Sequence, residues 1–195
     1  MEKSLKSTNS FLLCDINFDG FSSSNNWLGY VEKSGVFKSE IIGKTIDLFK
    51  DFFDGKENFF ILSALAYNDE RIGGIDISER VSLMYENMKK IGVLSRKDEV
   101  FDDYLYGDKP LSAKHLRLDW KRGFFCELSE LVMCHPGVVG QVCFYINLEE
   151  NVAIYPHDDV GFGCIGLNGD RTSGVKFLDF YKGYADFNVF IEGDD

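Results

Sequence analysis

The chain has 195 residues, of which 45% are hydrophobic and 27% are charged. These proportions are typical of a globular protein, and they exclude the disordered, collagen-like and disulfide-scaffold classes. The 32 Asp and Glu residues outnumber the 21 Lys and Arg residues, so the net charge is −11 at pH 7. Such a chain is a poor partner for nucleic acids and anionic membranes, which attract clustered Lys and Arg, and a good partner for a basic protein.

The N-terminus and the cysteines predict the compartment. No stretch approaches the length of about 18 apolar residues that a transmembrane helix needs. The apolar run before Asp15 is only four residues long, residues 11–14, whereas a secretory signal needs about 7–15 apolar residues in a row. The five cysteines are an odd number without a C-x-x-C pair, which is typical of reduced thiols. We therefore expect a cytoplasmic protein that makes no membrane contact.

The first half of the chain mixes predicted strands and helices. Residues 10–14 and 27–31 have the pattern of short strands on either side of a polar loop. Residues 39–53 place apolar side chains at helical spacing, and Asp54-Gly55 follows as a stop signal for a helix. Residues 59–66 form an apolar run of strand length, which predicts a buried central strand. Ser78 is the expected N-cap of a helix over residues 79–91.

The second half is typical of an antiparallel meander. In residues 141–148, Val142, Phe144 and Ile146 alternate with more polar neighbours, as a strand requires. Asn168-Gly169 is a strong signal for a hairpin turn. The expected elements are strands at 114–120, 141–148, 152–155, 160–167 and 187–191 and a helix at 174–184. With no internal repeat and no linker, we predict a single α+β domain over residues 1–195. Two or three helices would pack over a mostly antiparallel sheet.

Two motifs resemble ligand-binding loops. Residues Asp15–Gly20 match the start of a calcium loop, D-x-[DN]-x-[DN]-G, but position 12 is Asn26 where the loop needs a bidentate Glu. Residues Gly161–Gly166 match G-x-G-x-x-G, but a turn follows instead of the helix that would hold a pyrophosphate. We therefore expect a strand-connecting loop in the first case. In the second we expect a strand whose glycines allow close backbone approach.

The segment His157–Asp159 carries the alternative prediction of an enzyme. Imidazole and carboxylates can bind a metal or act as an acid/base pair, and His115 and His135 lie upstream. A metal-dependent hydrolase would use this His-Asp-Asp turn, with Asp15 or Asp19 as further candidate ligands. Against it, histidines of that class lie on packed helices, and an Asp pair in a turn is explained by backbone hydrogen bonding.

Other catalytic patterns are absent from the sequence. Cys134-His135 cannot form a thiolate–imidazole pair if both lie on one strand, since adjacent side chains then point to opposite faces. The chain has no G-x-S-x-G, Walker A, H-E-x-x-H or zinc-ligand spacing. We therefore predict that the protein is not an enzyme and has no cofactor and no metal.

The acidic residues gather in two regions. Residues 98–108 contain five acids and three aromatic residues but no Lys or Arg, and residues 149–195 contain ten acids against three basic residues. Charge speeds the encounter with a basic protein, and aromatic anchors supply desolvated contact energy. The predicted partner-binding residues are Asp98, Glu99, Asp102, Asp103, Tyr104, Tyr106, Asp108, Asp158 and Asp159.

The segment Val152–Gly161 resembles the strand–Asp-Asp–Gly turn of an uncharacterised bacterial domain family found at toxin–immunity loci. That family usually has Arg before the Gly and an acidic residue soon after it, where this chain has Val160 and Phe162. A small, acidic, aromatic-rich protein without a catalytic motif is also similar to immunity proteins, including those of contact-dependent growth inhibition. The resemblance implies that the protein binds and neutralises a cognate toxin, often a nuclease, by covering its basic cleft.

Overall fold

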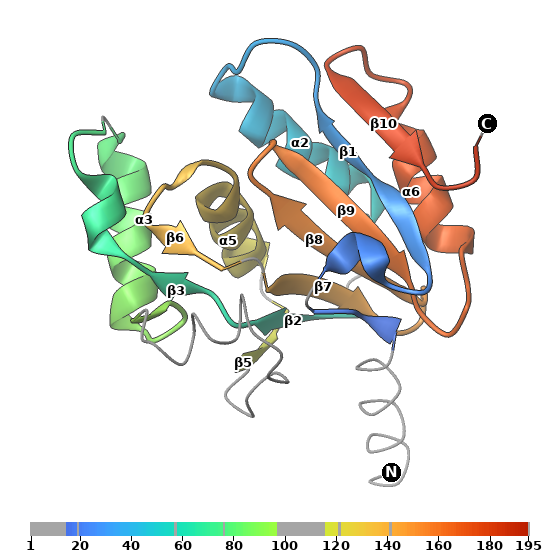
Figure 1. Cartoon of the computed structure of the whole chain (residues 1–195), viewed down its shortest axis with the longest axis horizontal. Coiled ribbons are helices and arrows are strands. Elements are labelled where there is room, and N and C mark those ends of the chain that lie inside the picture. The colour runs from blue at the N-terminus through green and yellow to red at the C-terminus, as the bar shows by residue number, and fades with distance from the viewer. Residues whose placement is uncertain are drawn as a thin grey trace, which may run out of the picture.

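The computed structural model describes residues 15–18, 20–56, 58–75, 77–96, 116–120, 122–140 and 142–194. They form a seven-stranded antiparallel sheet of order β10-β1-β9-β8-β7-β2-β5 and a three-stranded sheet of order β4-β3-β6 (Figure 1). In chain order the elements are η1 (Phe21–Ser23), β1 (Trp27–Lys33), α2 (Glu40–Phe52), β2 (Phe59–Ser63), β3 (Ala66–Tyr67), η2 (Asp69–Ile72), α3 (Glu79–Lys90), β4 (Ser95–Arg96), β5 (Leu116–Asp119), α5 (Arg122–Cys134), β6 (Val138–Val139), β7 (Cys143–Asn147), β8 (Val152–His157), β9 (Gly161–Gly166), α6 (Thr172–Tyr181) and β10 (Phe187–Ile191). The predicted α+β class with a mostly antiparallel sheet is confirmed.

The large sheet has a different cover on each face. Helices α2, α5 and α6 pack against one face, which we call the helix face, and α3 packs against α5 beside the small sheet. On the opposite face, which we call the front face, η1 lies across the strands (Figure 1). Strand β7 separates two cores: Cys143 and Tyr145 belong to the core under the helices, while Phe144 and Ile146 belong to the core of the front face. The alternation predicted for residues 141–148 is therefore confirmed.

Most of the elements predicted in the first half are also present. Helix α2 buries Ile42, Ile46 and Phe49 at helical spacing, and Gly55 follows it with a φ of 74°. In α3 the Ser78 hydroxyl accepts a hydrogen bond from the Val81 amide, as an N-cap does. The predicted strand at 10–14 lies outside the described residues. No helix in the described part of the chain is both long and apolar enough to cross a membrane.

The glycines of residues 161–166 lie on β9, as predicted for a strand with close backbone approach. A Cβ atom on Gly161 would overlap the Val31 carbonyl oxygen, and one on Gly163 would overlap the Tyr155 ring. Each missing side chain therefore makes room for a neighbouring strand or ring. No helix begins at these glycines, so they cannot present a helix N-terminus to a phosphate group.

Three local predictions were wrong. Helix α5 was not predicted, although Phe125, Leu128 and Leu131 are buried at helical spacing. Cys134 therefore ends a helix instead of lying on a strand with His135. The Asn168-Gly169 turn does form, closed by a bond of 2.9 Å from the Asp170 amide to the Leu167 carbonyl, but it is not a hairpin turn, since it leads into α6, the helix predicted at 174–184. In the third case β8 continues through His157, so the turn begins only at Asp158.

Candidate functional site

Three stacked aromatic rings lie on the front face where β1 pairs with β10. The Phe190 ring centroid is 5.6 Å from that of Trp27 and 5.7 Å from that of Tyr30, with interplanar angles of 27° and 22°. Phe190 is 43% exposed, and the other two residues are half-buried. We call Trp27, Tyr30 and Phe190 the aromatic strip. Exposed, ordered aromatic side chains of this kind are typical anchors of protein interfaces.

An irregularity in β1 creates the aromatic strip. In a regular strand, Trp27 and Tyr30 would point to opposite faces of the sheet. The pairing of β1 with β9 shifts between Trp27 and Gly29, and Gly29 has a φ of 129°. This bulge brings both rings to the front face, where their centroids lie 6.3 Å apart and each contacts the Phe190 ring. A Cβ atom on Gly29 would overlap the Phe190 carbonyl oxygen, so only glycine fits here.

A hydrogen bond holds the indole of the strip in place. Trp27 donates from Nε1 to the Tyr155 hydroxyl oxygen over 3.1 Å. Burial raises the pKa of Tyr155 to about 12, so the phenol remains protonated at neutral pH. Because the indole is held by this bond, a partner would meet a ring that is already oriented, and less entropy would be lost on binding.

The turn between β8 and β9 projects two acids beside this strip. Asp158 and Asp159 are exposed, and the Lys33 amide donates to the Asp159 carbonyl over 3.2 Å. The next residue, Val160, has a φ of 56° although its side chain is β-branched, and it is only 1% exposed. A left-handed valine costs roughly 1–3 kcal/mol and persists only where the surroundings enforce it. The buried Val160 side chain therefore fixes the turn and the two acids that precede it.

Together with Glu32 on β1, these residues form a group that we call the acidic turn: Glu32, Asp158 and Asp159. All three carboxylates act to raise the pKa of His157 through their charge, and Asp158 and Asp159 each bring an oxygen within 4.8 Å of a ring nitrogen of His157. None of the three forms an ion pair within the described part of the chain. Other surface acids do pair with lysines: Asp47, Asp69, Glu150, Asp179 and Asp186. The acidic turn thus keeps its negative charge open to a partner.

His157 links the acidic turn to the aromatic strip. Its ring meets the Tyr30 ring edge-on at a centroid distance of 6.2 Å. Its Nε2 lies 3.0 Å from the Val31 carbonyl oxygen, which can only accept, so Nε2 carries the proton. Burial lowers the pKa of His157, and this outweighs the Val31 hydrogen bond and the nearby carboxylates, which act to raise it. The ring is therefore neutral at pH 7.

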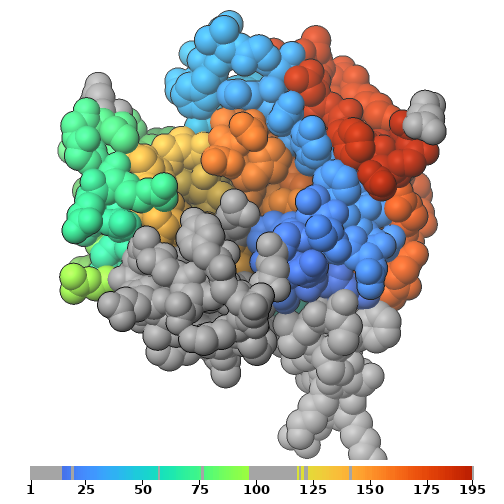
Figure 2. Space-filling view, viewed as in Figure 1, coloured from blue at the N-terminus to red at the C-terminus, as the bar shows by residue number. Residues whose placement is uncertain are grey.

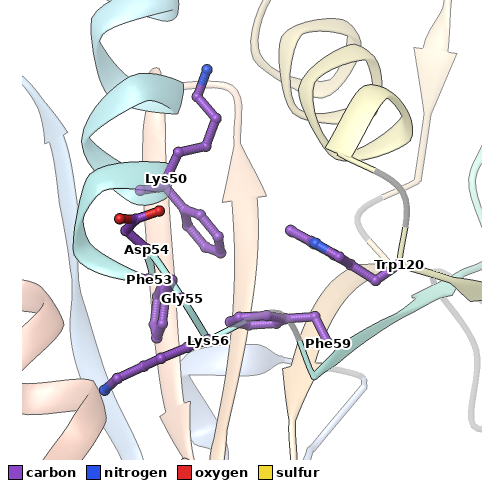
Figure 3. A pocket seen from close by; sticks show the side chains of 8 residues that line it. Lys50, Phe53, Asp54, Gly55, Lys56, Phe59 and Trp120 are labelled. Carbon is purple, nitrogen blue, oxygen red and sulfur yellow. The ribbon is translucent and has the colours of Figure 1, made fainter.

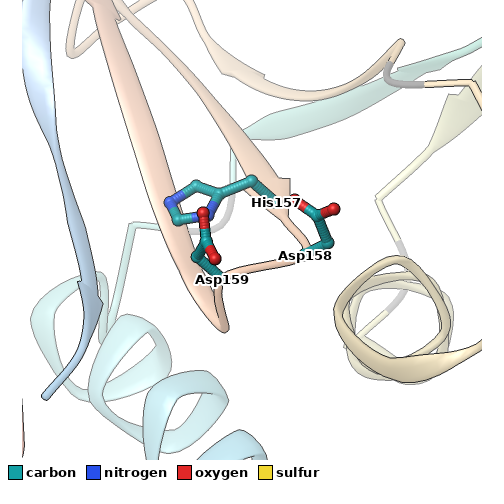
Figure 4. Close-up of side chains that lie close together, drawn as sticks. All are labelled: His157, Asp158 and Asp159. Carbon is teal, nitrogen blue, oxygen red and sulfur yellow. The ribbon is translucent and has the colours of Figure 1, made fainter. Parts of the chain in front are cut away.

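The same residues are the candidate metal ligands. A ring nitrogen of His157 and one oxygen each of Asp158 and Asp159 lie within 4.8 Å of one another. Figure 4 shows the Asp159 carboxylate pointing toward the imidazole ring, while the Asp158 carboxylate points to the other side of the turn. One nitrogen and two oxygens suit a divalent cation. Both carboxylates are exposed to water, however, whereas catalytic metal sites lie in shaped, dry cavities.

The other predicted metal or catalytic residues do not join this cluster. Asp15 accepts a hydrogen bond of 2.9 Å from the Asn168 amide and so ties the N-terminal loop to the turn before α6. His135 stacks on Tyr85 at 4.0 Å and accepts a bond from the Gly137 amide at Nδ1. His115 and Asp19 lie outside the described residues. Burial raises the pKa of Cys134 to about 11, so this thiol is not a ready nucleophile.

A small pocket lies between the C-terminal end of α2 and β2 (Figure 3). Its lining residues are Phe49, Lys50, Phe53, Asp54, Gly55, Lys56, Phe59 and Trp120. The ammonium ends of its two lysines point away from the aromatic rings, and they pair with Asp47 and Glu150. The pocket therefore offers an aromatic floor but does not bring a nucleophile and a base together.

The predicted partner-binding residues divide into two groups. Asp158 and Asp159 lie at the exposed tip of the β8–β9 hairpin, as just described. Those of the first acidic region lie outside the described residues: Asp98, Glu99, Asp102, Asp103, Tyr104, Tyr106 and Asp108. Sequence reasoning missed Glu32 and the aromatic strip, because they join the site only through the pairing of β1 with β9 and with β10. The available signal for an exposed edge was the uncharged stretch of residues 187–191, in which every residue except Asn188 is apolar.

Comparison with known proteins gives no match: no family model matches the chain, and no curated protein or solved structure is significantly similar to it. The function therefore has to be inferred from the side chains themselves.

The two described histidines predict how stability depends on pH. Burial lowers the pKa of both His135 and His157 below the ordinary value of 6.5. The unfolded chain thus binds protons that the folded chain does not, so stability is retained above that value and lost as the pH falls below it. For the buried His135, the loss reaches at most about 1.4 kcal/mol per pH unit.

We expect the free energy of unfolding in urea to decrease between about pH 6.5 and pH 5, above the range in which most carboxylates titrate. The decrease should be smaller in a His135→Phe variant, which keeps the stack on Tyr85 but cannot take up the proton. An equal slope in wild type and variant would show that His135 does not titrate differently in the two states.

Proposed function

We propose that this protein is a cytoplasmic inhibitor that binds a basic toxin and neutralises it by covering its active surface. One observation carries the proposal: the unpaired acidic turn lies next to an exposed and ordered aromatic strip. The two features act at different stages of binding. Carboxylates without internal partners attract a basic protein over long range, and the aromatic rings provide contact area that water leaves when the complex forms.

A nuclease is the class of toxin that fits best. A nuclease binds phosphate groups through clustered Lys and Arg. The carboxylates of Glu32, Asp158 and Asp159 offer the same sign of charge as a phosphate backbone and could occupy that cleft. The net charge of −11 means that the whole chain, and not only the acidic turn, attracts a basic partner. The resemblance of residues 152–161 to a family found at toxin–immunity loci supports a toxin as the partner.

The test uses the product of the reading frame beside the gene for this chain. We expect that product to arrest growth when it is expressed alone, and co-expression of this chain to restore growth. A Tyr30→Ala/Phe190→Ala variant should lose protection, because two of the three rings of the aromatic strip are gone. Phe37→Ala is the matched control, since Phe37 is also exposed, at 49%, but lies in the segment before α2.

Two outcomes would contradict the proposal. One is full protection by the double variant at equal protein levels. The other is a divalent cation bound to the purified protein at one ion per chain and lost in an Asp158→Ala/Asp159→Ala variant, together with hydrolytic activity. The second outcome would support the alternative of a metal-dependent hydrolase at the His-Asp-Asp turn.

A further inference from the structure

Strand β10 forms one edge of the large sheet. Its inner side pairs with β1 in antiparallel register, and it is the end strand of the sheet. Figure 1 shows β10 at the rim of the molecule, with α6 behind it on the helix face. In Figure 2, which shows the same face, the red atoms at the upper right belong to the C-terminal part of the chain, which contains β10. The outer side of β10 is therefore a place where a further strand could pair.

The hydrogen bonds show which backbone groups point outward. In an antiparallel pair, every second residue exchanges both of its bonds with the neighbouring strand. The Glu192 amide donates to the Leu28 carbonyl, and the Ser34 amide donates to the Asp186 carbonyl. The register fixed by these two bonds makes Asn188 and Phe190 the residues that bond to β1. The groups of residues 187, 189 and 191 therefore face the open edge.

Some of these outward groups are used within the chain. The Phe187 amide donates to the Tyr184 carbonyl, and the Ile191 carbonyl accepts from the Asp194 amide. This leaves the Phe187 carbonyl, both groups of Val189 and the Ile191 amide without a backbone partner in the described part of the chain. They are the alternating donors and acceptors that a short added strand requires.

The composition of β10 leaves this edge open. Natural edge strands are usually protected by a charged residue, a proline or a bulge. Strand β10 has the sequence FNVFI, which contains neither a charge nor a proline. Acids lie at both ends instead: Asp186 before the strand, and Glu192 and Asp194 after it. Asp186 pairs with Lys44 and Asp194 with Lys182, while Glu192 forms no ion pair in the described residues.

The charge around β10 indicates which kind of segment could pair with its outer side. If β10 of a second copy paired antiparallel to this one about Val189, Asp186 of each copy would lie opposite Glu192 of the other. Two chains that each carry a net charge of −11 would also repel each other as they approach. A segment with Lys or Arg would instead find the carboxylate of Glu192, which forms no ion pair in the described residues, at one end of β10. On the front face it would find the exposed ring of Phe190 for a cation–π contact.

We propose that β10, the end strand of the seven-stranded sheet, accepts an extended basic segment of the partner as an eighth strand. The inference rests on the proposed function, because it describes how the basic toxin would dock on the same face. Backbone bonds to the edge would supply affinity, and basic side chains beside Phe190 would supply selectivity.

The experiment uses a synthetic peptide of about seven residues, a usual strand length, that alternates arginine with valine. A peptide that alternates glutamate with valine is its matched control. Binding to the whole protein is followed by NMR through the exchange rates of the Val189 and Ile191 amides. We expect the basic peptide to slow both exchange rates and the acidic peptide to leave them unchanged.

A Val189→Pro variant tests the edge itself. Proline removes an amide that faces outward, so the ladder to β1 stays intact. We expect this variant to bind the basic peptide at least about tenfold more weakly, and Val189→Ala, which keeps the amide, to bind as wild type does. Unfolding curves of the two variants show whether each is folded.

Equal peptide affinity for the folded Val189→Pro variant and wild type would overturn the strand-addition proposal, as would the absence of binding by the basic peptide. Neither result bears on growth protection by the wild-type chain, which tests the inhibitor function separately. Conversely, a failure of growth protection would overturn the proposed function and leave the peptide result standing.

Discussion

A Gly29→Ala variant is expected to lose about 3 kcal/mol or more of its free energy of unfolding, one of the largest effects available from a single methyl group. Two causes act together. The φ of 129° lies in a region that side chains other than glycine rarely adopt, and the added Cβ atom would overlap the backbone carbonyl oxygen of Phe190. Strands β1 and β10 would have to separate, and the aromatic strip would lose its geometry. Urea unfolding followed by circular dichroism measures the loss.

Gly35→Ala is the matched control for this prediction. Gly35 also has a positive φ, of 71°, but nothing lies within 4 Å of a Cβ atom placed there. Its substitution should cost only the backbone strain of roughly 1–2 kcal/mol. If Gly29→Ala is no more destabilising than Gly35→Ala, the backbones of β1 and β10 are not in close contact at Gly29.

Reversing the charge of the acidic turn should slow the association with the toxin by about 10–100-fold at low salt. Asp158→Lys/Asp159→Lys replaces two open carboxylates by two ammonium groups at the point where a basic partner would approach. The fold should tolerate the change, since both side chains are exposed and unpaired in the described residues. Stopped-flow or surface-based kinetics with the product of the adjacent reading frame would measure the association rate.

An Asp51→Lys/Glu70→Lys variant separates the position of the charge from its amount. Both acids are exposed and form no ion pair in the described residues, and they lie at the end of α2 and in η2. The change in net charge is the same, but the acidic turn is kept. Equal slowing by the two double variants would mean that only the total charge matters, which would contradict a docking role for the turn.

The local parts of the fold could be predicted from the sequence because short-range patterns determine them. The spacing of Ile42, Ile46 and Phe49 predicts α2, and Ser78 predicts the start of α3. The alternation in residues 141–148 predicts the strand β7, although not that both of its faces are buried. Helix α5 was missed because its N-terminal residues include Gly123 and two adjacent phenylalanines, which weaken the helical signal. Tertiary packing of Phe125, Leu128 and Leu131 supports this helix more than propensity does.

Glu32 and the three residues of the aromatic strip could not be predicted from the sequence as parts of the candidate site. Asp158 and Asp159 were identified, because two adjacent acids after a strand indicate an exposed turn. Tyr30 and Phe190 are neighbours only because β1, near the start of the chain, pairs with β10, near its end. Hydrophobic periodicity carries no information about which strands pair over such a distance. The bulge at Gly29 further reverses the face that simple alternation assigns to Trp27.

Hydrogen exchange of the whole chain, alone and in complex with the product of the adjacent reading frame, measures most directly where that partner binds. Strand β1, the acidic turn and β10 should all gain protection, with the largest change at the outward-facing amides of Val189 and Ile191. Protection confined to α3 and the small sheet, with β1 and β10 unchanged, would show that a partner binds elsewhere and would contradict the assignment of this face.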